Sequence, residues 1–129
     1  MTPPGPGYWI GIAAAAHVRK AVAEGFAMFA HGRHSAVAKV LPGDRVTYYS
    51  PREGLKDGPE VRAFTAIGTV ADGPVGETYM APGVMGASRR VEWIGQARPA
   101  DVYPLLDRFS FVTDRSHWGM YFRKSLFRV

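Results

Sequence analysis

The clearest β-strand signal in this chain lies close to its beginning, and it distributes side chains unevenly between its two faces. Alternate side chains of a strand point to opposite sides, so Tyr8, Ile10 and Ile12 share one face. Trp9 shares the other face with Gly11, which has no side chain. Either Gly11 lets another element approach closely, or Trp9 walls an open slot for a flat ligand, since an aromatic face stacks on any planar ring. The sequence alone leaves both interpretations open.

The remaining strand and helix signals are short and follow one another without a repeat or an internal linker. Strands are predicted over 45–50, 63–70 and 89–96 and from Trp118 onward, and helices over 14–24, 35–40 (with Ser35 as N-cap) and 99–106. The stretches 52–60 and 74–87, rich in glycine and proline, are predicted to be irregular loops. Five or six strands with helices at their connections predict an α+β fold, a small mixed β-barrel with peripheral helices.

Length and composition are typical of one soluble globular domain. The chain has 129 residues, 47% of them apolar and 21% charged, and no apolar run reaches the length of a membrane span. Residues 1–7, rich in proline and glycine, are expected to form a disordered tail without signal-peptide features, followed by a domain over 8–129. The absence of cysteine excludes disulfides and thiolate metal sites, and we expect a cytoplasmic protein.

The charge balance favours a polyanionic partner. Sixteen Lys and Arg against eleven Asp and Glu give a formal net charge of +5. Nucleic acid, either RNA or DNA, is the partner class that fits this charge best. The candidate contacts to its phosphate backbone are Arg33, Lys39, Arg89, Arg90 and Arg123.

Motifs for enzyme chemistry are missing from the sequence. It contains no P-loop, no Gly-x-Ser-x-Gly elbow and no dinucleotide fingerprint after a strand, so we expect no catalytic residue and no cofactor. His31 and His34 stand three residues apart, but zinc needs a third protein ligand and their neighbours are Arg33 and Ser35. A polar loop that carries two histidines is therefore favoured over a metal site.

A second aromatic feature lies on the strand predicted over 45–50. Tyr48 and Tyr49 point to opposite faces of this strand, so Tyr48 fits the core and Tyr49 can line a cleft. Ser50 and Pro51 then form the rim of that cleft.

Five short motifs occur in an order and spacing similar to those of a known family. They are Tyr8-Trp9-Ile10-Gly11-Ile12, Gly25-Phe26 through His31-Gly32, Leu41-Pro42-Gly43-Asp44 leading into Tyr48-Tyr49-Ser50-Pro51, Phe64-Thr65-Ala66-Ile67-Gly68, and Trp118-Gly119-Met120-Tyr121-Phe122. Over nearly its whole length the chain resembles the EVE domain, and in particular the stand-alone prokaryotic branch of that family.

The resemblance implies a PUA-like β-barrel related to the YTH domain, with a nucleobase, often a modified one, held in an aromatic-walled pocket. The pocket of the family maps onto Trp9, Phe29, His31, Gly32, Tyr49, Ser50, Pro51 and Trp118, and we add Thr65 as a further polar group. A base would stack on Trp9 or Trp118, so we expect these two side chains to lie close together.

Three functions remain compatible with this reasoning. The first is a nucleic-acid-binding module that recognises a nucleobase. The alternative is an enzyme or sensor that acts on a small nucleotide-like ligand in the same pocket. The third is an interaction module in which the aromatic residues are only core.

Overall fold

The computed structural model describes residues 6–54, 56–81, 83–94 and 98–129. Its strands are β1 (Tyr8–Ile12), β2 (Phe26–Ala27), β3 (Arg45–Arg52), β4 (Glu60–Val70), β5 (Gly76–Ala81), β6 (Val84–Trp93), β7 (Ala100–Asp101) and β8 (Leu126–Arg128). Its helices are α1 (Ala15–Glu24), α2 (His34–Val37) and the 3₁₀ helices η1 (Ala30–Gly32), η2 (Tyr103–Arg108) and η3 (Arg115–Phe122). The predicted α+β class is confirmed.

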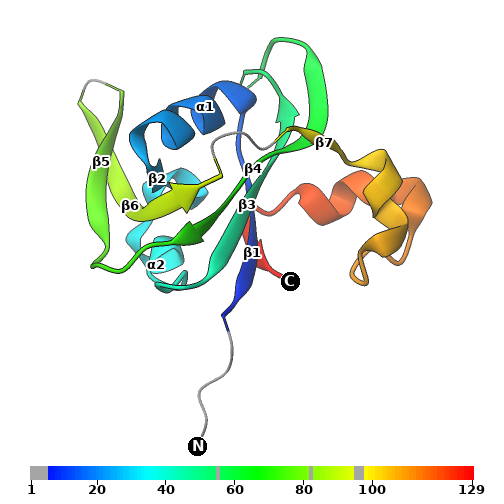
Figure 1. Cartoon of the computed structure of the whole chain (residues 1–129). Coiled ribbons are helices and arrows are strands. Elements are labelled where there is room, and N and C mark those ends of the chain that lie inside the picture. Colours follow the sequence, from blue (N-terminus) through cyan, green and yellow to red (C-terminus); the bar gives the residue numbers. More distant parts are fainter. Residues whose placement is uncertain (1–5, 55, 82, 95–97) are drawn as a thin grey trace, which may run out of the picture.

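One sheet organises the molecule. Its main path runs β2-β6-β4-β3-β1-β8, with β5 added to β6 and β7 added to β4. β1 is parallel to β3, whereas the other pairs are antiparallel. The sheet curls into a half-barrel around α1 and α2, and η2 and η3 lie on its other side (Figure 1). Because β8 pairs with β1, the first and last strands meet, as expected from the sequence.

The central strands are covered on both faces, so the chain has two apolar cores. The helix-side core gathers buried residues from α1, α2 and the sheet, including Val18, Val37 and Tyr48. The second core lies between the sheet and the C-terminal segment and contains Tyr49 and Phe122. The alternation along β3 sends the two adjacent tyrosines to opposite faces, as the sequence predicted, and each of them is buried in an apolar core.

The structure differs from the local sequence signals in four places. The stretch predicted as a loop over 74–87 contains β5 and the start of β6, which pair from Gly76↔Ser88 to Ala81↔Val84. The strand predicted from Trp118 is wrong, because that segment belongs to η3 and only β8 follows it as a strand. Ser35 does not cap a helix, because α2 already begins at His34 and has no side-chain cap. The helix predicted over 99–106 appears as η2, which begins later and is a 3₁₀ helix.

A single buried carboxylate connects β1 to the turn that precedes β3. The two oxygens of Asp44 accept hydrogen bonds from the backbone N–H of Gly7 (2.8 Å), the indole N–H of Trp9 (2.9 Å) and the backbone N–H of Leu41 (2.9 Å). Asp44 is only 7% exposed. Burial by itself would raise the pKa of this carboxyl, but the N–H donors outweigh burial and hold the pKa below its usual value.

Residues 1–5 of the predicted tail lie outside the described residues, and Gly7 is buried against Asp44. Within the part of the chain that the structure describes, no helix is long and apolar enough to cross a membrane.

We expect Asp44→Asn to lower the free energy of unfolding by about 2–3 kcal/mol. The side-chain NH₂ group of asparagine would replace one carboxylate oxygen and would then face an N–H donor instead of accepting its hydrogen bond. Chemical denaturation at neutral pH measures this loss, with Asp72→Asn, an exposed turn residue, as the control. Folding lowers the pKa of Asp44, so the Asp44 carboxylate stabilises the folded state fully above the pKa of an unfolded aspartate, about pH 3.9. This stabilisation is lost as the pH falls through the lower pKa that Asp44 has in the folded protein. The difference between the wild type and Asp44→Asn should therefore shrink on acidification. A difference that does not depend on pH would contradict this role for Asp44.

Candidate ligand-binding cleft

A cleft opens where the end of β3 meets η3, and we call it the Trp118 cleft. Its volume is about 620 Å³, and it is lined by Tyr49, Pro51, Arg62, Ser116, His117, Trp118, Gly119, Met120, Phe122 and Arg123. Cavities of this size accommodate small ligands or single bases. Three residues predicted for the pocket, Tyr49, Pro51 and Trp118, meet here, together with Arg123 from the predicted phosphate contacts.

The apolar side of the cleft is a packed set of aromatic rings. Tyr49 stacks on Phe122 with ring centroids 4.5 Å apart and an interplanar angle of 29°, and both residues are buried. The half-buried Trp118 lies edge-to-face against both, at 6.5 Å from Tyr49 and 6.0 Å from Phe122. A register shift between β3 and β4 after Tyr48, with Tyr48 opposite Ala66 and Tyr49 opposite Phe64, sets the position of Tyr49 on this face. The rings therefore form a rigid wall.

Among the residues that the structure describes, two arginines and no acidic residue line the cleft. The guanidinium of Arg62 lies 6.0 Å from the centre of the Trp118 ring and also donates to the Tyr103 hydroxyl. This hydrogen bond and the nearby Glu60 carboxylate raise the pKa of Arg62, so it stays charged. The backbone of Arg62 is left-handed, with φ at 48°, a conformation that costs a non-glycine residue about 1–3 kcal/mol and is concentrated at functional sites.

The hydroxyl of Tyr49 is the least expected polar group in the cleft. The residue is 2% exposed, and its hydroxyl makes no hydrogen bond among the described residues. No fully buried side-chain polar atom in that part of the chain lacks a partner, so the hydroxyl keeps contact with the cleft. Burial raises the pKa of Tyr49 to about 12, and the hydroxyl remains a proton donor at neutral pH. It is available to a ligand.

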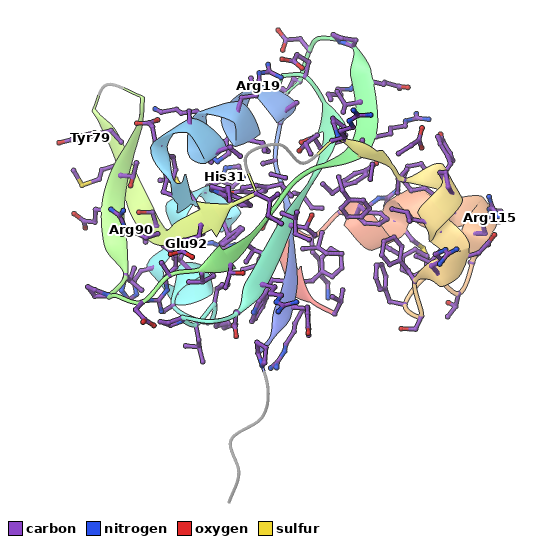
Figure 2. The ribbon with its side chains drawn as sticks, viewed as in Figure 1. Arg19, His31, Tyr79, Arg90, Glu92 and Arg115 are labelled. Atoms are coloured by element: carbon purple, nitrogen blue, oxygen red, sulfur yellow. The ribbon has the colours of Figure 1, made fainter. Side chains whose placement is uncertain are left out.

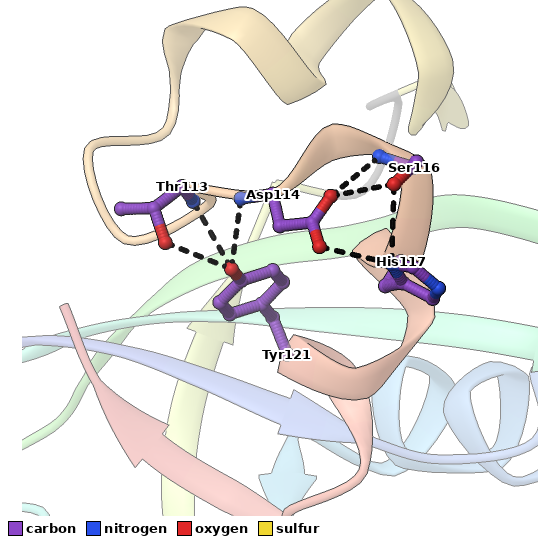
Figure 3. A network of polar contacts seen from close by, with 5 residues as sticks. All are labelled: Thr113, Asp114, Ser116, His117 and Tyr121. Atoms are coloured by element: carbon purple, nitrogen blue, oxygen red, sulfur yellow. Dashed lines mark hydrogen bonds and ion pairs between the residues drawn. The ribbon is translucent and has the colours of Figure 1, made fainter.

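A network of polar contacts fixes the segment that carries His117 (Figure 3). The Tyr121 hydroxyl accepts from the backbone N–H of Asp114 at 2.9 Å and also contacts Thr113, a contact that lowers the pKa of Tyr121. Asp114 accepts from the Ser116 hydroxyl at 2.6 Å and contacts Nδ1 of His117 at 2.9 Å. These contacts, the Ser116 hydrogen bond foremost, lower the pKa of Asp114. The network holds η3 in place before any ligand arrives.

The same geometry argues against nucleophilic catalysis by this set. Ser116 and Asp114 both contact Nδ1 of His117, at 3.1 Å and 2.9 Å. A serine–histidine–aspartate relay needs the serine and the carboxylate on different ring nitrogens, so that the histidine can take the serine proton while the carboxylate orients the ring. Ser116 is therefore not activated, and the network is structural.

The interpretation of an open slot beside Trp9 is wrong. Phe29 fills that space: a Cβ on Gly11 would lie 2.7 Å from the Phe29 ring and 3.2 Å from Tyr48. Trp9 packs against the helix-side core, and Trp118 packs against the second core. The two tryptophans are thus separated by the sheet and do not form one pocket, contrary to expectation.

The other residues predicted for the pocket lie outside the Trp118 cleft. Phe29 and Ser50 are 2% and 0% exposed, and the Ser50 hydroxyl bonds to that of Thr65 at 2.7 Å. His31 and Gly32 belong to the left-handed turn η1, where Gly32 packs so closely on Gly86 that a Cβ would lie 2.7 Å from the Gly86 Cα. Figure 2 shows His31 toward β5 and β6, far from Arg115 in η3.

The predicted phosphate contacts are spread over the molecule. Arg33, Lys39 and Arg90 are exposed in the region of α2 and β6. Arg89 is 7% exposed, and its guanidinium donates to the carbonyls of Val40 (2.8 Å) and Gly73 (3.1 Å), which makes it a structural residue. Only Arg123 reaches the cleft. No local signal identified Arg62 or His117 as its partners, because they come from β4 and η3 and meet only in the folded chain.

The described residues contain no group of three His, Asp or Glu side chains that could hold a metal ion. The arrangement offers instead an aromatic wall, a buried proton donor and two cations. This set can bind a flat, hydrogen-bonding ligand that carries negative charge.

Comparisons with known proteins agree with the fold. The family model described as EVE domain matches residues 7–129. The chain is 40% identical over 124 residues to UPF0310 protein msl3206 of Mesorhizobium japonicum, covering 95% of this chain and 83% of that protein. It is 35% identical over 122 residues to UPF0310 protein YdcG of Bacillus subtilis, with the same coverage of both chains. The NMR structure of Rpa0253 from Rhodopseudomonas palustris matches with a TM-score of 0.54 at 18% identity, covering 95% of this chain and 84% of that one, which supports the fold alone.

We expect Gly11→Ala to lower the free energy of unfolding by about 1–3 kcal/mol, because the added methyl group would overlap the Phe29 ring. Gly119→Ala is the matched control: a Cβ there meets nothing within 4 Å, so its stability should stay at the wild-type value. Thermal and urea denaturation measure both variants. Equal stability of the two variants would mean that the space beside Trp9 is open after all.

Proposed function

Because the chain belongs to the EVE domain family, we propose that it is a PUA-like binding module that holds a nucleobase of single-stranded nucleic acid in the Trp118 cleft. One observation carries the proposal. Trp118, Tyr49 and two arginines line a single cleft, and none of its described lining residues is acidic. Each of these groups matches one part of a nucleotide.

The base is the flat part, and it needs an aromatic surface. Stacking of a base on a tryptophan is worth about 1–3 kcal/mol. Trp118 is half-buried, so part of its ring remains accessible, while Phe122 packs against the ring in an edge-to-face contact. A methyl group on the base would add about 0.8 kcal/mol if fully buried against these rings, which is how an apolar wall favours a methylated base.

The edge of the base needs polar partners, and the phosphates need cations. The Tyr49 hydroxyl is placed to donate to a carbonyl oxygen or an unprotonated ring nitrogen. Two cationic side chains lie at the same cleft, namely Arg62, which also forms an ion pair with Glu60 at 3.1 Å, and Arg123. The arrangement of His117 supports binding without chemistry, since the nearby serine hydroxyl is not activated.

We expect Trp118→Ala to weaken binding of a fluorescently labelled single-stranded oligonucleotide by about 5- to 150-fold, the equivalent of one lost stack. Tyr79→Ala is the matched control, since Tyr79 is a 57% exposed aromatic residue on β5. Tyr49→Phe should bind more weakly than the wild type while keeping its thermal stability, because only the unpaired hydroxyl is lost. Fluorescence anisotropy measures all three. Equal affinity of Trp118→Ala and Tyr79→Ala would overturn the proposal, and turnover of the ligand, detected by mass spectrometry, would favour an enzyme.

We expect the affinity to fall with salt, with a slope of log affinity against log salt of about 0.7 for each phosphate neutralised on a single strand. Arg62→Gln and Arg123→Gln should each reduce the slope by about that amount. Arg19→Gln removes an exposed cation paired with Glu53 and should leave the slope unchanged. A slope that Arg62→Gln and Arg123→Gln leave intact would place the phosphates elsewhere on the molecule.

A further inference from the structure

A second cavity opens on the same face of the sheet but shares no lining residue with the Trp118 cleft. Its volume is about 400 Å³, and we call it the Tyr8 groove. It is lined by Tyr8, Trp9, Ile10, Arg45, Val46, Thr47, Phe64, Ala66, Ile67, Arg98, Ala100, Leu105, Phe109 and Val129. The floor of the groove comes from β1, β3 and β4. The opposite wall comes from Ala100 in β7, Leu105 in η2 and Phe109, which directly follows η2.

The groove is held open by fixed elements. β7 pairs with β4 at Phe64↔Ala100, and the Phe64 ring packs on Phe109 with centroids 5.6 Å apart. The two walls are therefore tied to each other at one end of the groove. A cavity between paired backbone segments cannot close by side-chain rotation alone.

Large apolar side chains remain exposed at its rim. Tyr8 is 49% exposed, Ile67 is 45% exposed and Val129 is 53% exposed. Single exposed apolar residues are ordinary on protein surfaces, but three around one concave apolar surface indicate a binding site. Among the described lining residues, the charged side chains are those of Arg45 and Arg98, both exposed. Arg45 lies over the Tyr8 ring at 6.0 Å, and neither arginine has an ion pair among the described residues.

We propose that the Tyr8 groove binds a small amphipathic anion, a molecule with an apolar body and one carboxylate or sulfonate head. The apolar body would lie against Ile10, Phe64 and Leu105, where it displaces water from a surface that cannot hydrogen-bond to it. The head would pair with Arg45 or Arg98, two cations that have no ion pair among the described residues and lie beside an apolar surface. A volume of about 400 Å³ and a concave shape suit a small molecule rather than a protein surface.

The test uses two probes on the full chain. 8-Anilinonaphthalene-1-sulfonate, an apolar ring system with a sulfonate, should bind at a single site with a rise in its fluorescence. Decanoate should displace it, and decanol, which has the same apolar body without the charge, should be at least about tenfold weaker as a competitor. In the double variant Arg45→Gln/Arg98→Gln this preference for decanoate should fall to about one.

Two further variants locate the site. Ala100→Trp fills the groove from an exposed position on β7 and should abolish dye binding, whereas Ala23→Trp, at an exposed position on α1, should not change it. Ile67→Glu adds a negative charge at the rim and should weaken decanoate more than decanol, which keeps the test valid if Ala100→Trp does not fold. Trp118→Ala should leave dye binding intact.

Several results would overturn the proposal. Dye binding that survives in a folded Ala100→Trp variant, or that disappears in Trp118→Ala, would place the dye outside the groove. Equal competition by decanoate and decanol in the wild type would show that the arginines do not select an anion. Failure of both compounds to displace the dye would show that the groove does not accept such molecules.

Discussion

The parallel pairing of β1 with β3 is the constraint on which the other features depend. Parallel strands must be connected by a crossover, and here the crossover carries α1, β2, η1 and α2. Of these, β2 joins the sheet beside β6, while α1 and α2 cover one face of it (Figure 1). Asp44 fixes the register of this pair, because one carboxylate holds the backbone before β1, the indole of Trp9 and the turn before β3. β8 then adds to the free side of β1, which brings the C-terminal segment onto the opposite face.

Both candidate sites follow from that second covered face. The C-terminal segment contributes 3₁₀ helices and loops rather than a helix that lies flat on the sheet, so it covers the sheet incompletely. One gap is the Trp118 cleft, with polar rims and two arginines; the other is the Tyr8 groove, which is almost wholly apolar. In the helix-side core, rings such as Phe29 and Tyr48 fill the space left by Gly11. Both candidate sites therefore lie on the less regular side of the sheet.

Much of the fold could be predicted from local patterns, and the failures have physical causes. The helix α1 was predicted correctly because Val18, Ala21 and Val22 recur at helical spacing before Gly25. β3 and β4 were found from their alternation and β-branched residues, although both extend further than predicted. The β5–β6 hairpin was missed because its glycines and prolines weaken every local strand signal, and only cross-strand pairing stabilises it. The segment around Trp118 alternates like a strand, yet the hydrogen bonds of Asp114 and Tyr121 hold it as a 3₁₀ helix.

By itself the sequence determined the family, the α+β class and the division of Tyr48 and Tyr49 between two faces, since alternation along a strand is a local property. Only the tertiary structure decided which aromatic residues share a site. Trp9 and Trp118 look equivalent in the sequence, but the sheet separates them. Tyr49, Arg62 and Trp118 line the same cleft although they are distant in the sequence. The alternation of side chains along a strand indicates which face each side chain occupies. Long-range strand pairing, here of β8 with β1 and of β7 with β4, determines which elements pack on that face.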